Sequence, residues 1–284
     1  MEMDHTAIEA VARLLAQRTG QKLSASRQWR IPSALSSLMR DYRITSNLQL
    51  THMLSPSGDR AFAQAVVEAL LNNETYFFRD RAVFDHISRR ILPELSERRR
   101  ATRRLSLWSV GCSTGQEPLS LAMLFAEQRA RWAGWSIDIL GTDVSARAIS
   151  AAREGFYTQF EIQRGLGVGQ MLSFFEEEGK GWRVNATLRD MVRYHTHNLL
   201  EVPPASDQFD LVLCRNVLLY FDPETRSTAF ENIARAMAPD GYLLLGGGET
   251  VVGQTDRLRL DPDNAGFYVR RSSLSQPDGR VING

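Results

Sequence analysis

The sequence is poor in cysteine and contains no long hydrophobic run. Its 284 residues include only two cysteines, Cys112 and Cys214, in glycine-rich or strongly apolar surroundings. Cysteines in such surroundings are usually small, reduced core residues, so we expect no disulfide. No spacing of cysteine and histidine resembles a zinc site, and we predict no bound metal. No apolar segment approaches the roughly 20 residues that a membrane-spanning helix needs, so we expect no membrane insertion.

The chain also lacks a large excess of charge of either sign. Its formal net charge is +1, which provides no general attraction to nucleic acid, and we expect no nucleic-acid partner. The N-terminus carries Glu2, Asp4 and Glu9 where a secretory leader would be positive, which favours a cytoplasmic protein. Apolar residues make up 43% of the chain, enough for a large core, and the length favours two modest domains.

Residues 1–80 are predicted to form an N-terminal helical domain, because apolar residues recur there at helical spacing. Part of this domain is strongly basic. Between residues 13 and 43, one acid, Asp41, faces seven positive residues: Arg13, Arg18, Lys22, Arg27, Arg30, Arg40 and Arg43. Such a face is either a solvated helix surface or a docking face for an acidic protein, and the sequence leaves both open.

Residues 81–284 are predicted to form an α/β domain with a Rossmann-like parallel sheet, because apolar runs alternate with helical stretches. The expected strands are residues 105–110, 137–142, 209–214 and 242–245, and the expected helices are residues 118–129, 146–154 and 223–237. An amphipathic stretch, 84–95, precedes them. The polar run 97–104 is interpreted as a solvated linker between domains. Residues 179–197 interrupt the alternation and predict a small antiparallel β-subdomain, with strands at 182–184 and 191–195.

Residues 73–80, Asn-Glu-Thr-Tyr-Phe-Phe-Arg-Asp, combine an amide, a hydroxyl, three aromatic rings and an arginine just ahead of the α/β pattern. Three successive aromatic residues suit a buried wall, whereas Arg79 is rarely buried without an anion or acceptor. The segment therefore predicts a site shared by two parts of the chain. Alternatively, Asn73 or Thr75 caps a helix that begins near Asp80 while the aromatic residues pack.

Residues 110–118, Val-Gly-Cys-Ser-Thr-Gly-Gln-Glu-Pro, follow a buried strand and open a helix. Small residues such as Gly111 let a ligand approach the backbone at such a turn. The spacing lacks the Lys-Ser/Thr end of a P-loop and the third glycine of the dinucleotide fingerprint. Glu117 would repel phosphate but suits a cofactor with positive charge, such as S-adenosylmethionine (SAM). A simple tight strand-to-helix connection is the alternative.

Further polar residues follow other predicted strands. Asp143 ends one strand, and an acid at that place in a Rossmann-like sheet typically accepts hydrogen bonds from ribose hydroxyls. It could instead cap the following helix. Asn198 and Leu199 follow the predicted β-subdomain, and Arg215 and Asn216 follow another strand, so both pairs reach the carboxyl edge where ligands bind.

These motifs, followed by Cys-Arg-Asn-Val-Leu-Leu-Tyr-Phe-Asp at 214–222, closely resemble in their order the CheR family of chemoreceptor glutamate methyltransferases. The resemblance covers nearly the whole chain. It implies an N-terminal helical domain followed by a Rossmann-like SAM-dependent methyltransferase domain with a small β-subdomain. It also implies that the protein transfers the methyl group of SAM to glutamates of a chemoreceptor's cytoplasmic helical domain. The products would be glutamyl methyl esters and S-adenosylhomocysteine.

The resemblance also implies roles for individual residues. Asn73, Thr75 and Arg79 would contact the cofactor or line its methyl end, Glu117 would lie near the methionine part, and Asp143 would bind the ribose. The adenosine pocket would be completed by Asn198, Leu199, Arg215 and Asn216. Tyr220 would stand with Arg79 near the transferred methyl group, and these two are the predicted catalytic residues.

Some positions differ from the pattern of many relatives. Gln116 replaces an acid, and residues 246–249 read Gly-Gly-Gly-Glu in place of Gly-His-Ser-Glu. The hairpin around residues 179–181 looks shorter than in members that grip a receptor's C-terminal pentapeptide, so we predict that no such tether is needed. Two other classes remain open: a methyltransferase of RNA or of a small molecule, and a non-catalytic module that senses the cofactor.

Overall fold

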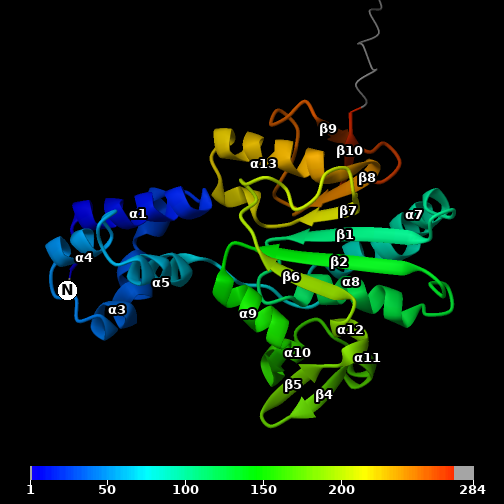
Figure 1. Ribbon diagram of the computed structural model, residues 1–284, viewed down its shortest axis with the longest axis horizontal. Helices are drawn as coiled ribbons and strands as arrows, with labels where there is room; N and C mark the ends of the chain where they lie inside the picture. Colours follow the sequence, from blue (N-terminus) through cyan, green and yellow to red (C-terminus); the bar gives the residue numbers. More distant parts are fainter. Residues whose placement is uncertain (1, 272–284) are drawn as a thin grey trace, which may run out of the picture.

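The chain begins with a group of helices that lies to one side of a large sheet (Figure 1). This computed structural model describes residues 2–271. The helices of the N-terminal group are α1 His5–Thr19, α2 Ala25–Gln28, α3 Ile31–Asp41, α4 Asn47–Met53 and α5 Arg60–Leu70. Their apolar faces meet in a core of their own, in which Val11, Leu35 and Val66 are fully buried. The predicted helices ahead of the α/β domain are confirmed.

The end of α1 is shaped to meet the α/β domain. Asp4 caps its beginning by accepting from the backbone N–H of Ala7, 2.8 Å away. Gly20 ends the helix with φ 75°, a left-handed conformation that favours glycine. A Cβ at this position would lie 2.3 Å from Cδ1 of Leu200 in the other domain. The glycine therefore lets the chain after α1 run close against the α/β domain.

The α/β domain is built on a mixed sheet with strand order β6-β2-β1-β7-β8-β10-β9. Neighbouring strands from β6 to β8 run parallel, whereas β10 is antiparallel to β8 and to β9. The strands are β1 Arg104–Val110, β2 Ser136–Asp143, β6 Val192–Thr196, β7 Phe209–Cys214, β8 Met237–Leu245, β9 Leu258–Leu260 and β10 Phe267–Arg270. The predicted Rossmann-like fold class is confirmed.

The central strands are buried on both faces, as expected of a parallel sheet covered by helices. Leu107 and Leu211 pack on one face, and Trp108 and Val212 pack on the other. The second face is covered by α13 Pro223–Ala236 (Figure 1). The first face packs against α6 Arg81–His86, the π-helical turn η1 Ile87–Ile91, α7 Leu92–Arg98, α8 Gln116–Glu127, α9 Ala146–Glu154 and α12 Ala186–Arg189. Both cysteines are buried and unpaired, which agrees with their predicted place in the core.

A small antiparallel sheet is present, but part of its predicted composition is wrong. Its strands, in the order β3-β5-β4, are β3 Phe156–Thr158, β4 Phe175–Glu178 and β5 Gly181–Val184, accompanied by α10 Gln159–Gln163 and α11 Val168–Phe174. Residues 191–195 do not belong to it, because Val192–Thr196 forms β6 of the main sheet, parallel to β2. As an edge strand, β6 alternates buried and exposed residues, and this pattern does not reveal its pairing partner.

The polar run 97–104 is not a linker between domains, and that prediction is wrong. It contains the end of α7 and the start of β1, both within the α/β domain. Arg99 Nε lies 2.6 Å from Asp210 Oδ1, and the same guanidinium also pairs with Asp240. The sequence pattern misses this because both acids follow more than a hundred residues later in the chain.

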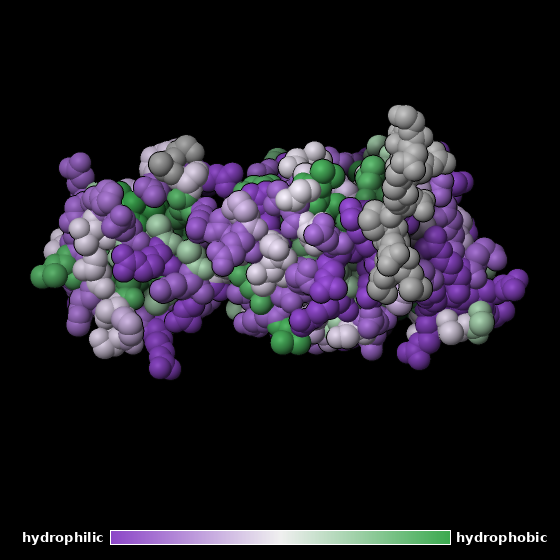
Figure 2. All heavy atoms as spheres, turned by 90° about the horizontal axis from the view of Figure 1, so that it is seen from above, coloured by the Kyte–Doolittle hydropathy of each residue, from purple (hydrophilic) through white to green (hydrophobic). Residues whose placement is uncertain are grey.

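The connection between the two domains lies earlier. Leu71 packs against the core of the N-terminal helices, whereas Phe77 and Phe78 belong to the core under the sheet. A boundary at residue 80 itself stays a prediction. The surface in Figure 2 is mainly hydrophilic, with hydrophobic side chains in small scattered groups. Among the helices of residues 2–271, none has the length and apolar character that crossing a membrane requires.

Candidate active site

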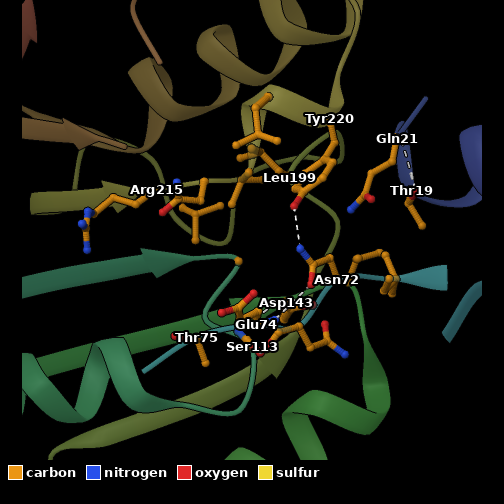
Figure 3. Close-up of a pocket in the computed structure, with 18 of the residues that line it drawn as sticks. Thr19, Gln21, Asn72, Glu74, Thr75, Ser113, Asp143, Leu199, Arg215 and Tyr220 are labelled. Carbon is orange, nitrogen blue, oxygen red and sulfur yellow. Dashed lines mark hydrogen bonds between the residues drawn. The ribbon is translucent and has the colours of Figure 1, made fainter. Parts of the chain in front are cut away.

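A pocket lies where β1, β2 and β7 end, on the side of the N-terminal helices (Figure 3). Val110, Asp143 and Arg215 come from or directly follow the carboxyl ends of these strands. All residues named as site candidates from the sequence line this one pocket: Asn73, Thr75, Arg79, Gly111, Glu117, Asp143, Asn198, Leu199, Arg215, Asn216 and Tyr220. Polar side chains from distant parts of the chain therefore converge at one place.

The glycine turn after β1 connects three of these segments. Gly111 has φ +66°, and a Cβ there would lie 2.4 Å from Cγ2 of Val217. The backbone N–H of Ser113 donates to Oδ2 of Asp143 at 2.9 Å, and its hydroxyl donates to the carbonyl of Asn73 at 2.7 Å. The turn is thus fixed against the end of β2, against residues 73–80 and against the loop after β7.

Asp143 is nearly buried at the centre of the pocket wall. Each carboxylate oxygen accepts one backbone N–H, from Ser113 at 2.9 Å and from Ser145 at 2.8 Å. Burial raises the pKa of Asp143 above its ordinary value, although these N–H donors oppose the shift. The side-chain cap of α9 is Ser145, which accepts from Ala148, and not Asp143. The capping alternative for Asp143 is therefore wrong.

Glu117 belongs to a buried charged network that the sequence did not indicate. The side chain of Arg215 is only 2% exposed, and its Nη1 lies 3.2 Å from Oε2 of Glu117. The same guanidinium pairs with Asp80. Glu117 also accepts a hydrogen bond from the hydroxyl of Ser109 at 2.8 Å. We expected the negative charge of Glu117 to face a positively charged cofactor. Part of that charge is already balanced by Arg215.

Residues 73–80 form a wall of the pocket and do not provide a cap. Helix α6 begins after Asp80, and its N-terminus receives no side-chain capping bond, so the capping alternative for Asn73 and Thr75 is wrong. Phe77 is fully buried. Arg79 is half-buried, and within residues 2–271 its guanidinium has no carboxylate partner within salt-bridge distance; its Nη1 lies 3.3 Å from the carbonyl of Glu74. Its charge is therefore available on the pocket side.

Tyr220 enters the pocket from the opposite side, on the short 3-10 helix η2 Leu218–Tyr220. Its hydroxyl accepts a hydrogen bond from Nδ2 of Asn72 at 3.0 Å, the dashed line in Figure 3. The guanidinium carbon of Arg27 in α2 lies 4.9 Å from the centre of its ring. The phenol thus stands where the helical domain meets the loop after β7.

The N-terminal helices supply pocket residues that the sequence reasoning missed. Thr19 and Gln21, at the end of α1, line the pocket and appear at one side of Figure 3. No sequence signal could have found them, because only the docking of the domains brings them there. His197 also lines the pocket. Burial lowers the pKa of His197, since it disfavours the charged imidazolium.

Specific contacts hold the helical domain across the pocket. Lys22 Nζ lies 2.5 Å from the Asp222 carboxylate, and Asn198 Nδ2 donates to the carbonyl of Arg18 at 3.1 Å. The carboxylate of Glu68 in α5 accepts the N–H of Ala146 at 2.9 Å, in the first turn of α9. An acid is favourable there because helix N-termini carry positive partial charge. Each contact lies beside a pocket-lining segment.

Comparison with known proteins identifies relatives along most of the chain. Residues 73–266 match the family described as CheR methyltransferase, SAM binding domain. A chemotaxis protein methyltransferase of Vibrio anguillarum is 34% identical over 262 residues, covering 91% of this chain and 94% of the relative. Chemotaxis protein methyltransferase 1 of Pseudomonas aeruginosa is 32% identical over 260 residues, covering 90% and 94%. A solved TehB-like SAM-dependent methyltransferase from Corynebacterium glutamicum has a TM-score of 0.37 and 17% identity, covering 64% and 84%.

The Rossmann-like sheet, with most of the residues of this pocket inside a segment that matches a SAM-binding domain, defines the protein as a SAM-dependent methyltransferase. Its cofactor is therefore SAM. The match extends over most of the chain, and the chain belongs to the CheR methyltransferase family. The resemblance stated from the motifs is confirmed. The parts played by individual pocket residues stay predictions.

Proposed function

We propose that the protein methylates glutamate side chains of chemoreceptors, forming glutamyl methyl esters and S-adenosylhomocysteine in the cytoplasm. Its relatives named chemotaxis protein methyltransferases match over nearly the whole chain, including the helical domain. The observation that carries the proposal is that Arg79 and Tyr220 line the same pocket as Asp143 and the Gly111 turn. A guanidinium and a phenol suited to a carboxylate thus share a pocket with groups suited to the cofactor.

The pocket residues fit SAM in their chemistry. Asp143 is a nearly buried acceptor suited to ribose hydroxyls, and Gly111 gives the pocket-lining turn its left-handed conformation. Glu117 offers a carboxylate for the positively charged methionine part, although Arg215 shares it. The remaining contacts proposed for the cofactor come from Asn73, Thr75, Arg79, Asn198, Leu199, Arg215 and Asn216. We propose that no metal takes part.

Methyl transfer from SAM to a carboxylate needs little acid-base catalysis from the protein. The bound cofactor supplies a methyl group on a positively charged sulphur, and a glutamate with a reference pKa of about 4.3 is already ionised near neutrality. The site must align the carboxylate and exclude water, a contribution that reaches roughly 7–11 kcal/mol in favourable intramolecular reactions. Arg79 holds the carboxylate through its paired N–H donors, and Tyr220 orients it through its hydroxyl. Full neutralisation of the acceptor would weaken the nucleophile.

Substitution of the two proposed catalytic residues tests the function directly. With labelled SAM and receptor cytoplasmic fragments, we expect Arg79→Ala and Tyr220→Phe to lower transfer about 10- to 100-fold, the value of one or two charge-assisted hydrogen bonds. For Tyr220→Phe, calorimetry with S-adenosylhomocysteine should give an unchanged affinity. Arg81→Ala is the matched control, because Arg81 does not line the pocket.

The nature of the label distinguishes this function from its rivals. A base-labile label on the receptor marks a methyl ester. Label on RNA, or no transfer to any substrate by a protein that binds the cofactor, would contradict the proposal. Parent-like transfer rates in both variants would remove Arg79 and Tyr220 from the mechanism.

The helical domain offers a groove for the receptor. Lys22, Arg27 and Arg30 line it together with apolar residues of α3 and α5. The groove shares Gln21, Leu71, Asn72 and Tyr220 with the cofactor pocket. We propose that acidic helices of the receptor's cytoplasmic domain dock along this basic groove and bring a glutamate to Tyr220.

We propose that methylation does not require a tether to the receptor's C-terminal pentapeptide. Strands β4 and β5 are joined by only two residues, Gly179 and Lys180, which supports a compact hairpin without an extended grip. Receptor fragments with and without their C-terminal pentapeptide should therefore be methylated at similar rates.

A further inference from the structure

We propose that Asn72 is a positioning residue that aims the hydroxyl proton of Tyr220 into the pocket. Asn72 donates its Nδ2 hydrogen to the Tyr220 oxygen at 3.0 Å. It precedes the Asn-Glu-Thr motif and belongs to the connection between the domains. The inference rests on the proposed function, because it assigns Asn72 a role that acts only through Tyr220.

The orientation of the Asn72 amide follows from its second contact. The backbone N–H of Glu74 points at Oδ1 of Asn72, 3.4 Å away. A donor facing Oδ1 places the NH₂ group toward the phenol, since the two ends of an amide are distinguished by their partners. In this contact Asn72 is therefore the donor and the Tyr220 oxygen is the acceptor.

The direction of this bond decides where the phenol proton can go. A tyrosine hydroxyl has one hydrogen to donate and lone pairs to accept. Because Asn72 occupies a lone pair, the hydrogen of Tyr220 stays free, and accepting one bond strengthens a hydroxyl as a donor. Within residues 2–271, Asn72 is the hydrogen-bonding partner of this hydroxyl. The free hydrogen is thus available to an acceptor carboxylate in the pocket.

The pair lies at the junction of two cavities. Asn72 and Tyr220 both line the cofactor pocket and also the basic groove, which residues of α2, α3 and α5 line as well. In Figure 3 their hydrogen bond spans the space between the loop that carries Tyr220 and the connection that carries Asn72. A substrate arriving through the groove would meet the hydroxyl at this junction.

Other contacts hold the rest of Tyr220 but leave its hydroxyl to Asn72. The backbone N–H of Lys22 donates to the Tyr220 carbonyl at 2.8 Å, and Arg27 stacks over the ring. These interactions fix the backbone and the ring plane, whereas rotation of the O–H bond is set by its hydrogen-bond partner. The side chain of Asn72 is exposed, so its removal leaves no cavity in either core.

A double-mutant cycle tests the inference. We expect Asn72→Ala to lower kcat for receptor methylation about 5- to 10-fold, the worth of one neutral hydrogen bond, and to leave the KM for receptor and the affinity for S-adenosylhomocysteine within about twofold. Asn72→Asp has the same shape but accepts, so it should turn the phenol proton away and slow kcat further. In the Tyr220→Phe background, Asn72→Ala should have no added effect.

The outcomes separate this inference from the proposed function. If Tyr220→Phe is slow while Asn72→Ala retains the parent kcat, or if the two effects multiply in the double variant, the positioning role is wrong and the function stands. If Tyr220→Phe itself retains the parent rate, the proposed catalytic role of Tyr220 fails first. Thermal unfolding of each variant checks that a changed rate does not reflect unfolding.

Discussion

Some residues of this pocket both fix the local backbone and offer a polar group to a ligand. Asp143 both binds two backbone N–H groups and faces the pocket, so it orders the glycine turn while keeping lone pairs free. Sequence reasoning identified such residues because each directly follows a predicted strand. It missed the pairing of Arg215 with Glu117 and Asp80, since three segments distant in sequence meet there.

The left-handed conformation of Gly111 predicts that a side chain at this position destabilises the protein. Gly111→Ala forces a side chain into the left-handed region at φ +66° and against Val217. We expect a loss of about 2–4 kcal/mol in the free energy of unfolding and weaker binding of S-adenosylhomocysteine. Gly247→Ala is the matched control, because a Cβ there meets nothing within 4 Å. Urea unfolding and calorimetry give both quantities, and equal behaviour of the two variants would refute the argument.

The lowered pKa of His197 predicts how pH affects the stability of the fold, and the ionised acceptor predicts how pH affects kcat. Burial lowers its pKa from the ordinary 6.5, so it is neutral above that pH. Below about pH 6.5 the unfolded chain binds more protons at this histidine, and acid therefore destabilises the fold. Because the acceptor carboxylate is already ionised, kcat should stay constant within about twofold from pH 7 to 9. A sigmoidal change in kcat within that window would show a titrating catalytic group.

At the scale of elements, the loop after β7 matters most, because it carries Asn216 and Tyr220. Glu249, after β8, accepts four backbone N–H groups, and three of them belong to this loop. Its Oε1 accepts from Leu218 at 2.7 Å and Leu219 at 3.2 Å, and its Oε2 accepts from Asn216 and Gly246, both at 2.8 Å. One carboxylate thereby fixes the loop that presents the phenol.

Replacing this carboxylate should loosen the loop. For Glu249→Ala we expect a loss of about 2–3 kcal/mol in unfolding free energy and a lower kcat, because several N–H groups lose a charged acceptor. Glu231→Ala, which removes an exposed partner of Arg257, should cost less than about 1 kcal/mol. Urea unfolding measures both. A Glu249→Ala protein as stable and active as the control variant would contradict the role.

Element prediction succeeded where one face or both faces of an element are buried in a regular pattern. The predicted strand 209–214 and helix 146–154 coincide with β7 and α9. The strand at β6 was predicted but assigned to the wrong sheet, and the run 97–104 was taken for a linker, because in both cases the partner lies far away in sequence. The shared pocket could be predicted, whereas the contribution of Thr19 and Gln21 to its wall could not.

On the scale of the whole molecule, the basic groove should govern the encounter with receptor. Arg30 lines the groove and is exposed. We expect Arg30→Glu to lower kcat/KM for receptor fragments about 3- to 10-fold at low ionic strength, with a smaller effect at high salt, because screening weakens electrostatic attraction. Unchanged kcat and unchanged affinity for S-adenosylhomocysteine would locate the effect in receptor binding.

Reversal of Arg40 and Arg43 provides the comparison. Both are exposed in the basic stretch but do not line the groove. A groove that receives the receptor predicts a smaller loss for these two changes than for Arg30→Glu. An equal loss would assign the effect to the overall charge of the domain, and no loss in any of the variants would mean that the basic face is only solvated.

The end of α1 contributes Thr19 and Gln21 to the same pocket as Asp143 and Glu117. Occupancy of the pocket and association of the two domains are therefore thermodynamically linked, since any ligand that touches both favours the docked arrangement. Dissociation of S-adenosylhomocysteine would lose the part of the binding free energy that comes from contacts with both domains. The rate at which the enzyme resets between methylation events would then depend on how tightly Lys22, Glu68 and Asn198 hold the domains together.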